Sequence, residues 1–168
     1  MLDENFFIEL KKYVDRHLRT LNFAVCYSPM SSDEELCESI PSIELEDFIK
    51  NTRKPTFNQV LFNLIDKKGA SDSDIYKRAG IDRRHFSKIR SNPGYRPGKN
   101  TAIALAIALE LNKSQADQLL GAAGYSLSES ETFDLVIRFC LEKKIFDINH
   151  VNEALDYFSL KPLAGVLE

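Results

Sequence analysis

The chain has 168 residues and a formal net charge of −3 at pH 7; 43% of the residues are hydrophobic and 28% are charged. This composition excludes fibrous and low-complexity proteins and allows one hydrophobic core or two small ones. The longest apolar run, AIALAIALEL, is too short to span a bilayer, and the acidic start, MLDENFFIELKK, is unlike a signal peptide. We therefore expect a compact protein that stays in the cytoplasm.

The residue types that usually carry catalysis or bind metal form no constellation in this sequence. Cys26, Cys37 and Cys140 form no CxxC pair and are odd in number, which favours free thiols in a reducing compartment. The chain has no HExxH motif, no phosphate-binding loop and no GxSxG motif. Residues 147–156, DINHVNEALD, place Asp, His and Glu at helical spacing, which a capped helix start explains more simply than a metal site. The sequence predicts no enzyme, no metal and no cofactor.

An acidic segment with two helices is predicted first. Apolar residues recur at spacings of three and four over residues 5–21, which predicts an amphipathic helix whose apolar stripe needs a partner surface. Residues 22–30 have short β-like character and form either an extended linker or one strand. Residues 31–55 are polar, acidic and interrupted by Pro41, which indicates a linker with one helix near 44–51.

The helical signals then become regular. A first helix stops at Gly69. Residues 71–90, SDSDIYKRAGIDRRHFSKIR, predict two short helices around a tight turn, which is the outline of a helix-turn-helix. Ser71 can cap the first of these helices, the Ala-Gly pair ending at Gly80 supplies the break, and Asp82 can cap the second.

The second helix of this pair is basic on one face. The spacing of Ile81, Phe86 and Ile89 turns those side chains toward a core. The side chains left outward are those of Arg83, Arg84, Ser87 and Lys88. Residues 53–99 hold 12 Lys and Arg against 4 Asp and Glu, whereas the segments on either side are acidic. Such a local positive field attracts polyphosphate even though the whole chain is acidic.

Further helices follow a basic loop at residues 90–100. Residues 101–111 are apolar nearly all round and should form the buried central helix. Asn112 with Gln115 predicts the start of another helix.

Two amphipathic helices are predicted at the C-terminal end. Ser128 with Glu131 resembles a capping box, and apolar stripes run over residues 133–141 and 148–158. Either these stripes extend the core or they form a dimer or partner surface. We favour the core, because adjacent helices commonly bury their stripes against each other.

Residues 56–120 resemble the lambda-repressor-like helix-turn-helix domain of XRE-type bacterial regulators. The segment IYKRAGIDRRHFSKI carries the helix-turn-helix part of the resemblance, and IALAIALELNKSQADQLL carries the next two helices. Residues 56–160, including AGYSLS, also resemble a poorly characterised bacterial helix-turn-helix family. The fold implied is all-α, with a five-helix lambda-repressor-like bundle at 55–124, an acidic N-terminal helical segment and linker at 1–54, and a C-terminal helical extension at 125–168.

Three residues depart from the XRE pattern. Asp72 stands where that pattern usually has a Gln that contacts phosphate, and a carboxylate there would repel phosphate. Tyr76 stands where a small Ala is typical. Arg90 occupies a position often held by Glu, which reverses the charge.

The function implied is that of a DNA-binding transcriptional regulator whose recognition helix enters the major groove. The residues expected near base edges are Arg83, Arg84 and Ser87. The residues expected on the phosphate backbone are Lys67, Lys68, Lys88, Tyr95, Arg96 and Lys99. The alternative is a protein-interaction or adaptor module with a degenerate helix-turn-helix that does not bind DNA. The corresponding partners are double-stranded DNA, a second copy in a homodimer, an acidic protein, or the acidic N-terminal segment lying across the basic face.

Overall fold

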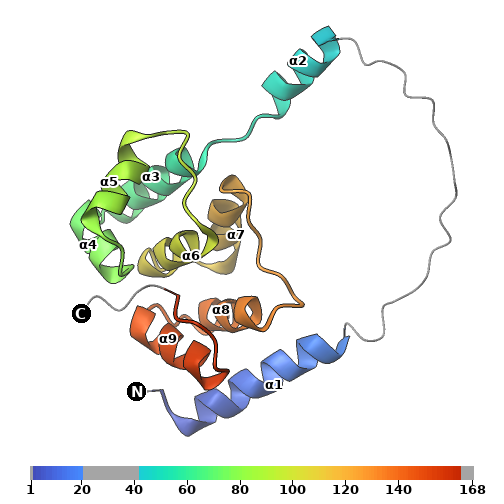
Figure 1. Ribbon diagram of the computed structural model, residues 1–168, viewed down its shortest axis with the longest axis vertical. Coiled ribbons are helices and arrows are strands. Elements are labelled where there is room, and N and C mark those ends of the chain that lie inside the picture. Colours follow the sequence, from blue (N-terminus) through green and yellow to red (C-terminus); the bar gives the residue numbers. More distant parts are fainter. Residues whose placement is uncertain (1, 21–41, 164–168) are drawn as a thin grey trace, which may run out of the picture.

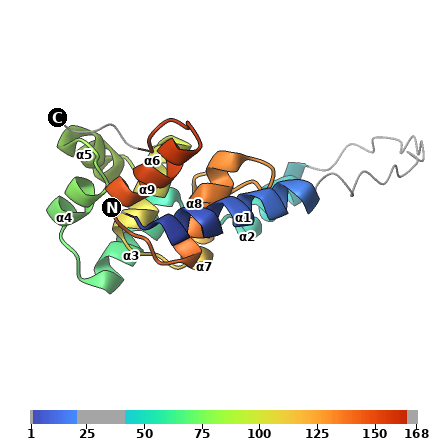
Figure 2. The ribbon, with the colours of Figure 1, turned by 90° about the horizontal axis from the view of Figure 1, so that it is seen from below.

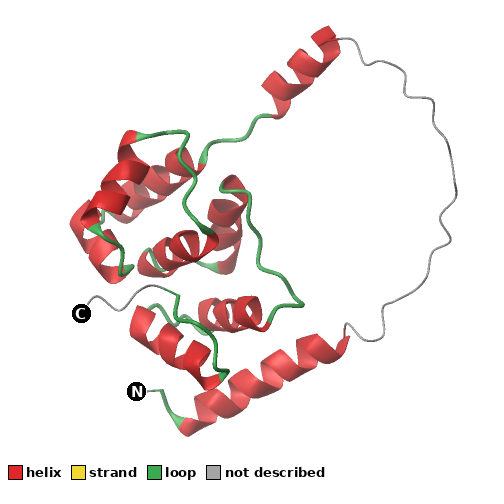
Figure 3. Cartoon of the chain, viewed as in Figure 1, coloured by secondary structure: helices red, strands yellow, loops and turns green. Residues whose placement is uncertain are grey.

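The computed structural model describes residues 2–20 and 42–163, and all regular structure in these ranges is helical (Figures 1 and 3). The all-α prediction is confirmed for this part of the chain. The predicted strand at 22–30, the linker around Pro41, and Cys26 and Cys37 lie outside the described residues. The helices are α1 (Glu4–Thr20), α2 (Ser42–Thr52), α3 (Phe57–Lys68), α4 (Asp72–Arg78), α5 (Arg83–Ser91), α6 (Lys99–Ala108), α7 (Lys113–Ala122), α8 (Thr132–Glu142) and α9 (Ile148–Tyr157). None of these helices is long and apolar enough to cross a membrane.

The central helix α6 organises the core around it. Its residues from Ala102 to Ala108 are all buried, and Leu105 is fully buried. The alanines let neighbouring helices approach closely, and α6 packs against α4, α7 and α9. The prediction of a buried central helix is therefore confirmed, although the helix begins at Lys99, two residues before the predicted start.

Local caps position the helices around α6. Thr56 and Gln59 form a capping box at the start of α3, and Asn112 and Gln115 form the predicted one at the start of α7. Gly69 ends α3 with a φ of 63°, in the left-handed region that glycine adopts without strain.

The turn between α4 and α5 has the predicted caps. The side chains of Ser71 and Asp82 accept backbone hydrogen bonds at the starts of the two helices. Gly80 has a φ of 62°, its N–H donates to the carbonyl of Lys77, and the Ile81 N–H donates to the carbonyl of Tyr76 over 2.9 Å. These paired bonds are a Schellman motif, which ends α4 abruptly and turns the chain into α5.

The predicted capping box at the start of α8 is wrong. The helix begins at Thr132, and its N-cap, Glu131, makes no side-chain cap bond. The Ser128 N–H instead donates to Oδ2 of Asp134 over 2.7 Å, and the Ser128 hydroxyl accepts from the N–H of Ser130. The buried carboxylate of Asp134 therefore holds the chain in a turn before the helix, so α8 starts later than the sequence pattern indicates.

The apolar stripe of α1 finds its partner at the other end of the chain, on α8 (Figures 1 and 2). Leu10 and Val14 are buried, and the ring centroids of Phe6 and Tyr13 lie 5.5 Å and 5.0 Å from that of Phe139. The helices α8 and α9 bury their own stripes in the same core, which confirms the core interpretation of the C-terminal pair.

The helix α2 stands apart from this body (Figure 1). Its large apolar side chains are exposed, with Ile43 76% and Phe48 65% accessible. It also carries three acids, Glu44, Glu46 and Asp47.

Candidate nucleic-acid interface

The helix α5 presents a basic face to solvent. Phe86 and Ile89 are buried, as the spacing predicts, and His85 is half-buried. The exposed side chains include those of Arg83, Arg84, Ser87 and Lys88. Because residues three and four apart lie on one side of a helix, Arg83 and Ser87 form one row and Arg84 and Lys88 form the next.

The row of Arg83 and Ser87 borders a groove between α4 and α5. This groove has a volume of about 310 Å³, and Tyr76 also lines it. The Tyr76 ring lies with its centroid 5.9 Å from that of Phe86, so it fills the space between the two helices of the helix-turn-helix. The large residue at a position where Ala is typical is therefore accommodated by packing against α5.

Two departures from the XRE pattern pair with each other. Arg90 Nη1 donates a hydrogen bond to Oδ2 of Asp72 in an ion pair that joins the end of α5 to the start of α4. The Arg90 guanidinium carbon also lies 4.8 Å from the centroid of the Phe62 ring. The positive charge of Arg90 on α5 thus compensates the negative charge of Asp72 on α4.

The row of Arg84 and Lys88 continues into the loop after α5. Lys88 Nζ lies 4.7 Å from the centroid of the Tyr95 ring, and the Tyr95 hydroxyl lies 3.3 Å from Nε2 of His85. These contacts hold the loop against α5. They bring two of the predicted phosphate-contacting residues, Lys88 and Tyr95, together beside α5.

Two other residues predicted to contact phosphate, Lys99 and Lys68, make contacts within the protein. Lys99 Nζ donates to Oδ2 of Asp134 over 2.6 Å, in an ion pair whose carboxylate side chain is only 2% exposed. Lys68 Nζ donates to the carbonyl of Glu110 over 3.1 Å, in the turn between α6 and α7. Lys67 is exposed at the end of α3. None of these three lysines joins the cluster around Tyr95 in the described contacts.

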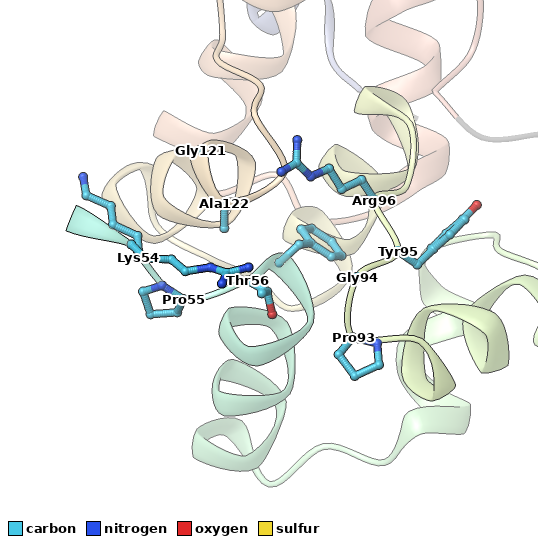
Figure 4. Close-up of a pocket in the computed structure, with 11 residues that line it drawn as sticks. Lys54, Pro55, Thr56, Pro93, Gly94, Tyr95, Arg96, Gly121 and Ala122 are labelled. Atoms are coloured by element: carbon cyan, nitrogen blue, oxygen red, sulfur yellow. The ribbon is translucent and has the colours of Figure 1, made fainter. Parts of the chain in front are cut away.

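A second basic feature was missed by sequence reasoning. Arg53 and Lys54, just before α3, share a hollow of about 390 Å³ with Arg96 (Figure 4). We call this feature the basic hollow; its other lining residues are Pro55, Thr56, Phe57, Pro93, Gly94, Tyr95, Gly121 and Ala122. The Arg-Lys-Pro run at residues 53–55 could have indicated it, but the acidic residues before that run led to its interpretation as part of a linker.

The pKa shifts of Glu110 and Cys140 lie outside this interface. A hydrogen bond from Arg78 lowers the pKa of Glu110, an effect that the nearby charges of Arg78 and Lys68 reinforce. Burial raises the pKa of the Cys140 thiol to about 12, which keeps it protonated and weakly nucleophilic at neutral pH.

The acids and histidine of residues 147–156 have structural contacts. Asp147 caps α9 by accepting from the N–H groups of Asn149 and His150, and Glu153 accepts from the N–H of Leu2. Within residues 2–20 and 42–163, no three His, Cys, Asp or Glu side chains are placed to hold a metal ion. The basic side chains on α5 and its loop can instead bind anions and donate hydrogen bonds. No family model, no curated protein and no solved structure matches the chain, so its function is argued from this surface.

Proposed function

We propose that this protein is a DNA-binding transcriptional regulator that uses α3 to α7 as a lambda-repressor-like bundle and α5 as its recognition helix. The observation that carries the proposal is the exposed basic face of α5. Its cations Arg83, Arg84 and Lys88 form no ion pair with any carboxylate in the described part of the chain. An α-helix fits the major groove, where arginine binds guanine with two hydrogen bonds.

The two rows on α5 suggest a division of roles. We assign the base edges to Arg83 and Ser87, which share one row, and to Arg84, which begins the other row at the start of the helix. Lys88 and Tyr95 lie together beside the helix and suit the phosphate backbone, as does Arg96 in the same loop. Lys67 stays in the phosphate set, whereas the hydrogen bonds of Lys68 and Lys99 give those residues structural roles first.

The test is the salt dependence of binding to a generic DNA duplex, measured by fluorescence anisotropy with the full chain. If about five phosphates are neutralised, the logarithm of affinity should fall against the logarithm of salt with a slope of about −4 to −5. Arg84→Gln should weaken binding, whereas Lys12→Gln, on the exposed side of α1, should not. A slope near zero, or equal effects of the two substitutions, would contradict a DNA interface on α5.

The exposed apolar face of α2 favours a second candidate, the protein-interaction module. Phe48 and Ile49 are 65% and 52% exposed, and such side chains commonly mark contact surfaces. This function gains support if the full chain binds no duplex at low salt and if Phe48→Ser abolishes a protein complex that the wild type and Lys12→Gln both form. Duplex binding with the expected salt slope would instead favour the regulator.

A further inference from the structure

We propose that the basic hollow binds a phosphate group, supplied either by a small phosphorylated molecule or by a DNA backbone phosphate. Three cations line it, and they come from two segments of the chain: Arg53 and Lys54 precede α3, and Arg96 lies in the loop after α5. No aspartate or glutamate is among the residues that line the hollow.

The cations of the hollow are available to a ligand. The side chains of Arg53, Lys54 and Arg96 form no ion pair or hydrogen bond with another residue in the described ranges. Figure 4 shows Arg96 extending from its loop toward Gly121 and Ala122 at the end of α7. Its Nη1 also lies near Gly124, 4.0 Å from the point that a Cβ on that residue would occupy. Like charges held near one hollow repel each other, and an anion between them would offset that repulsion.

The chemistry of the lining suits a phosphate group. A guanidinium donates two parallel hydrogen bonds to phosphate oxygens, and the hollow offers two such groups and an ammonium. Tyr95 also lines the hollow, and its ring extends from the loop away from Arg96 (Figure 4). Small-molecule sites in proteins measure roughly 300 to 1,000 Å³, so about 390 Å³ has room for a phosphorylated molecule larger than the bare ion.

The hollow adjoins the proposed DNA surface through Tyr95, because the ammonium group of Lys88 lies over the ring of this tyrosine. A DNA phosphate could therefore reach the hollow while α5 lies in the groove. That source of phosphate rests on the proposed function, whereas a small phosphorylated ligand does not.

The first arm of the test titrates inorganic phosphate and inorganic pyrophosphate into the full-length protein at constant ionic strength, followed by amide chemical shifts. We expect saturable shifts at Gly94, Tyr95 and Gly121. Arg96→Gln should weaken the affinity by about tenfold or more, because each charge-assisted hydrogen bond lost has an effect of that order. Arg53→Gln should act in the same direction, and Lys12→Gln is the matched control for lost positive charge.

The second arm measures duplex affinity for the same variants and assigns the source of the phosphate. If the hollow holds a DNA phosphate, Arg53→Gln and Arg96→Gln should weaken binding to all sequences alike and reduce the salt slope by about 1 each. If it holds a small ligand, those variants should lose pyrophosphate binding and keep their duplex affinity. If the wild type binds no duplex but still binds pyrophosphate, the proposed function fails and the phosphate site stands. Unchanged binding of both probes in Arg53→Gln and Arg96→Gln would overturn the proposal.

Discussion

Asp72 and Arg90 show how two unfavourable residues can offset each other at an interface. Each departs from the XRE pattern in the direction that changes its charge, and the structure joins them in one ion pair across the helix-turn-helix. Both side chains are at least one-third exposed, so the pair contributes little to folding. Its importance lies in the electrostatic field that DNA would meet.

Removing only one member of this pair should therefore affect DNA binding more than stability. Arg90→Ala leaves the carboxylate of Asp72 uncompensated beside the phosphates, and we expect duplex affinity to fall by about fivefold at low salt. The double variant Asp72→Asn with Arg90→Ala should recover most of that loss. Anisotropy titrations of the single and double variants measure the coupling. A double variant that binds as weakly as Arg90→Ala would assign Arg90 a direct contact with DNA instead.

Lys99 should matter for stability because its partner is buried. Lys99→Met keeps the aliphatic stem but leaves the carboxylate of Asp134 without its cation, and we expect a loss of about 2 to 3 kcal/mol in the free energy of unfolding. Lys88→Met, on the exposed face of α5, should cost less than about 0.5 kcal/mol and should weaken duplex binding. Urea denaturation followed by circular dichroism compares the two variants. Equal midpoints would show that the Lys99–Asp134 pair does not stabilise the fold.

At the scale of elements, local sequence signals predicted the helices, whereas tertiary contacts determine where α8 begins. The caps at Ser71, Asp82 and Asn112 depend on residues within one turn, so the sequence pattern is sufficient to find them. The start of α8 depends on Asp134, a carboxylate that is buried because Lys99, far away in the sequence, lies beside it. A capping pattern cannot show that contact.

The candidate site likewise has features that local sequence patterns predict and features that depend on tertiary contacts. Helical spacing was enough to predict that Phe86 and Ile89 are buried and that Arg83 is exposed. The basic hollow could not be predicted, because Arg53 and Arg96 meet only when α3 and the loop after α5 pack together. The sequence also could not show which lysines form contacts within the protein.

The docking of α1 on α8 should make stability sensitive to alkaline pH. Burial, followed by the negative charge of Glu142, raises the pKa of Tyr13 from 10.0 to about 12. A group with a raised pKa in the folded state binds more protons than in the unfolded state, so its stabilising effect is complete below pH 10 and is lost as the pH rises from 10 to about 12.

The variant Tyr13→Phe isolates this effect. We expect the midpoint of urea unfolding to fall more steeply between pH 10 and about pH 12 in the wild type than in Tyr13→Phe, because the variant has no phenol to ionise at that site. Parallel curves for the two proteins would mean that Tyr13 ionises in the folded and unfolded states alike.

At the scale of the whole molecule, the two helices of the acidic N-terminal segment differ in what they contribute to the fold. The helix α1 contributes Leu10 and Val14 to the buried core and lies on α8, away from α5 (Figure 1). A truncation that removes it would also expose the aromatic side chains of α8, so loss of acidic charge and loss of the core would be confounded. The helix α2 carries acidic charge, and its large apolar side chains are exposed, so changing it leaves the core intact.

Masking of the basic face by acidic charge is therefore best tested on α2 within the full chain. A control for net charge is a variant with three other exposed acids neutralised, namely Asp117→Asn, Glu131→Gln and Asp156→Asn. This control and the α2 variant, in which the three acids of α2 are neutralised, each raise the net charge by three units. Only the α2 variant changes the helix that is tethered to α3. Any difference between them reports the position of the charge rather than its amount.

We expect the α2 variant, Glu44→Gln with Glu46→Gln and Asp47→Asn, to bind a generic duplex more tightly than the wild type at low salt. The tether to α3 gives these acids a high effective concentration near Arg84 and Lys88, so even weak ion pairing competes with phosphate. Salt screens such exposed pairs, and the difference should shrink as the ionic strength rises toward 0.15 M, where the Debye length is about 8 Å. The measurement is duplex affinity by anisotropy at a series of salt concentrations. If the α2 variant and the net-charge control gain affinity equally, the effect belongs to the total charge of the molecule, and α2 is not a mask.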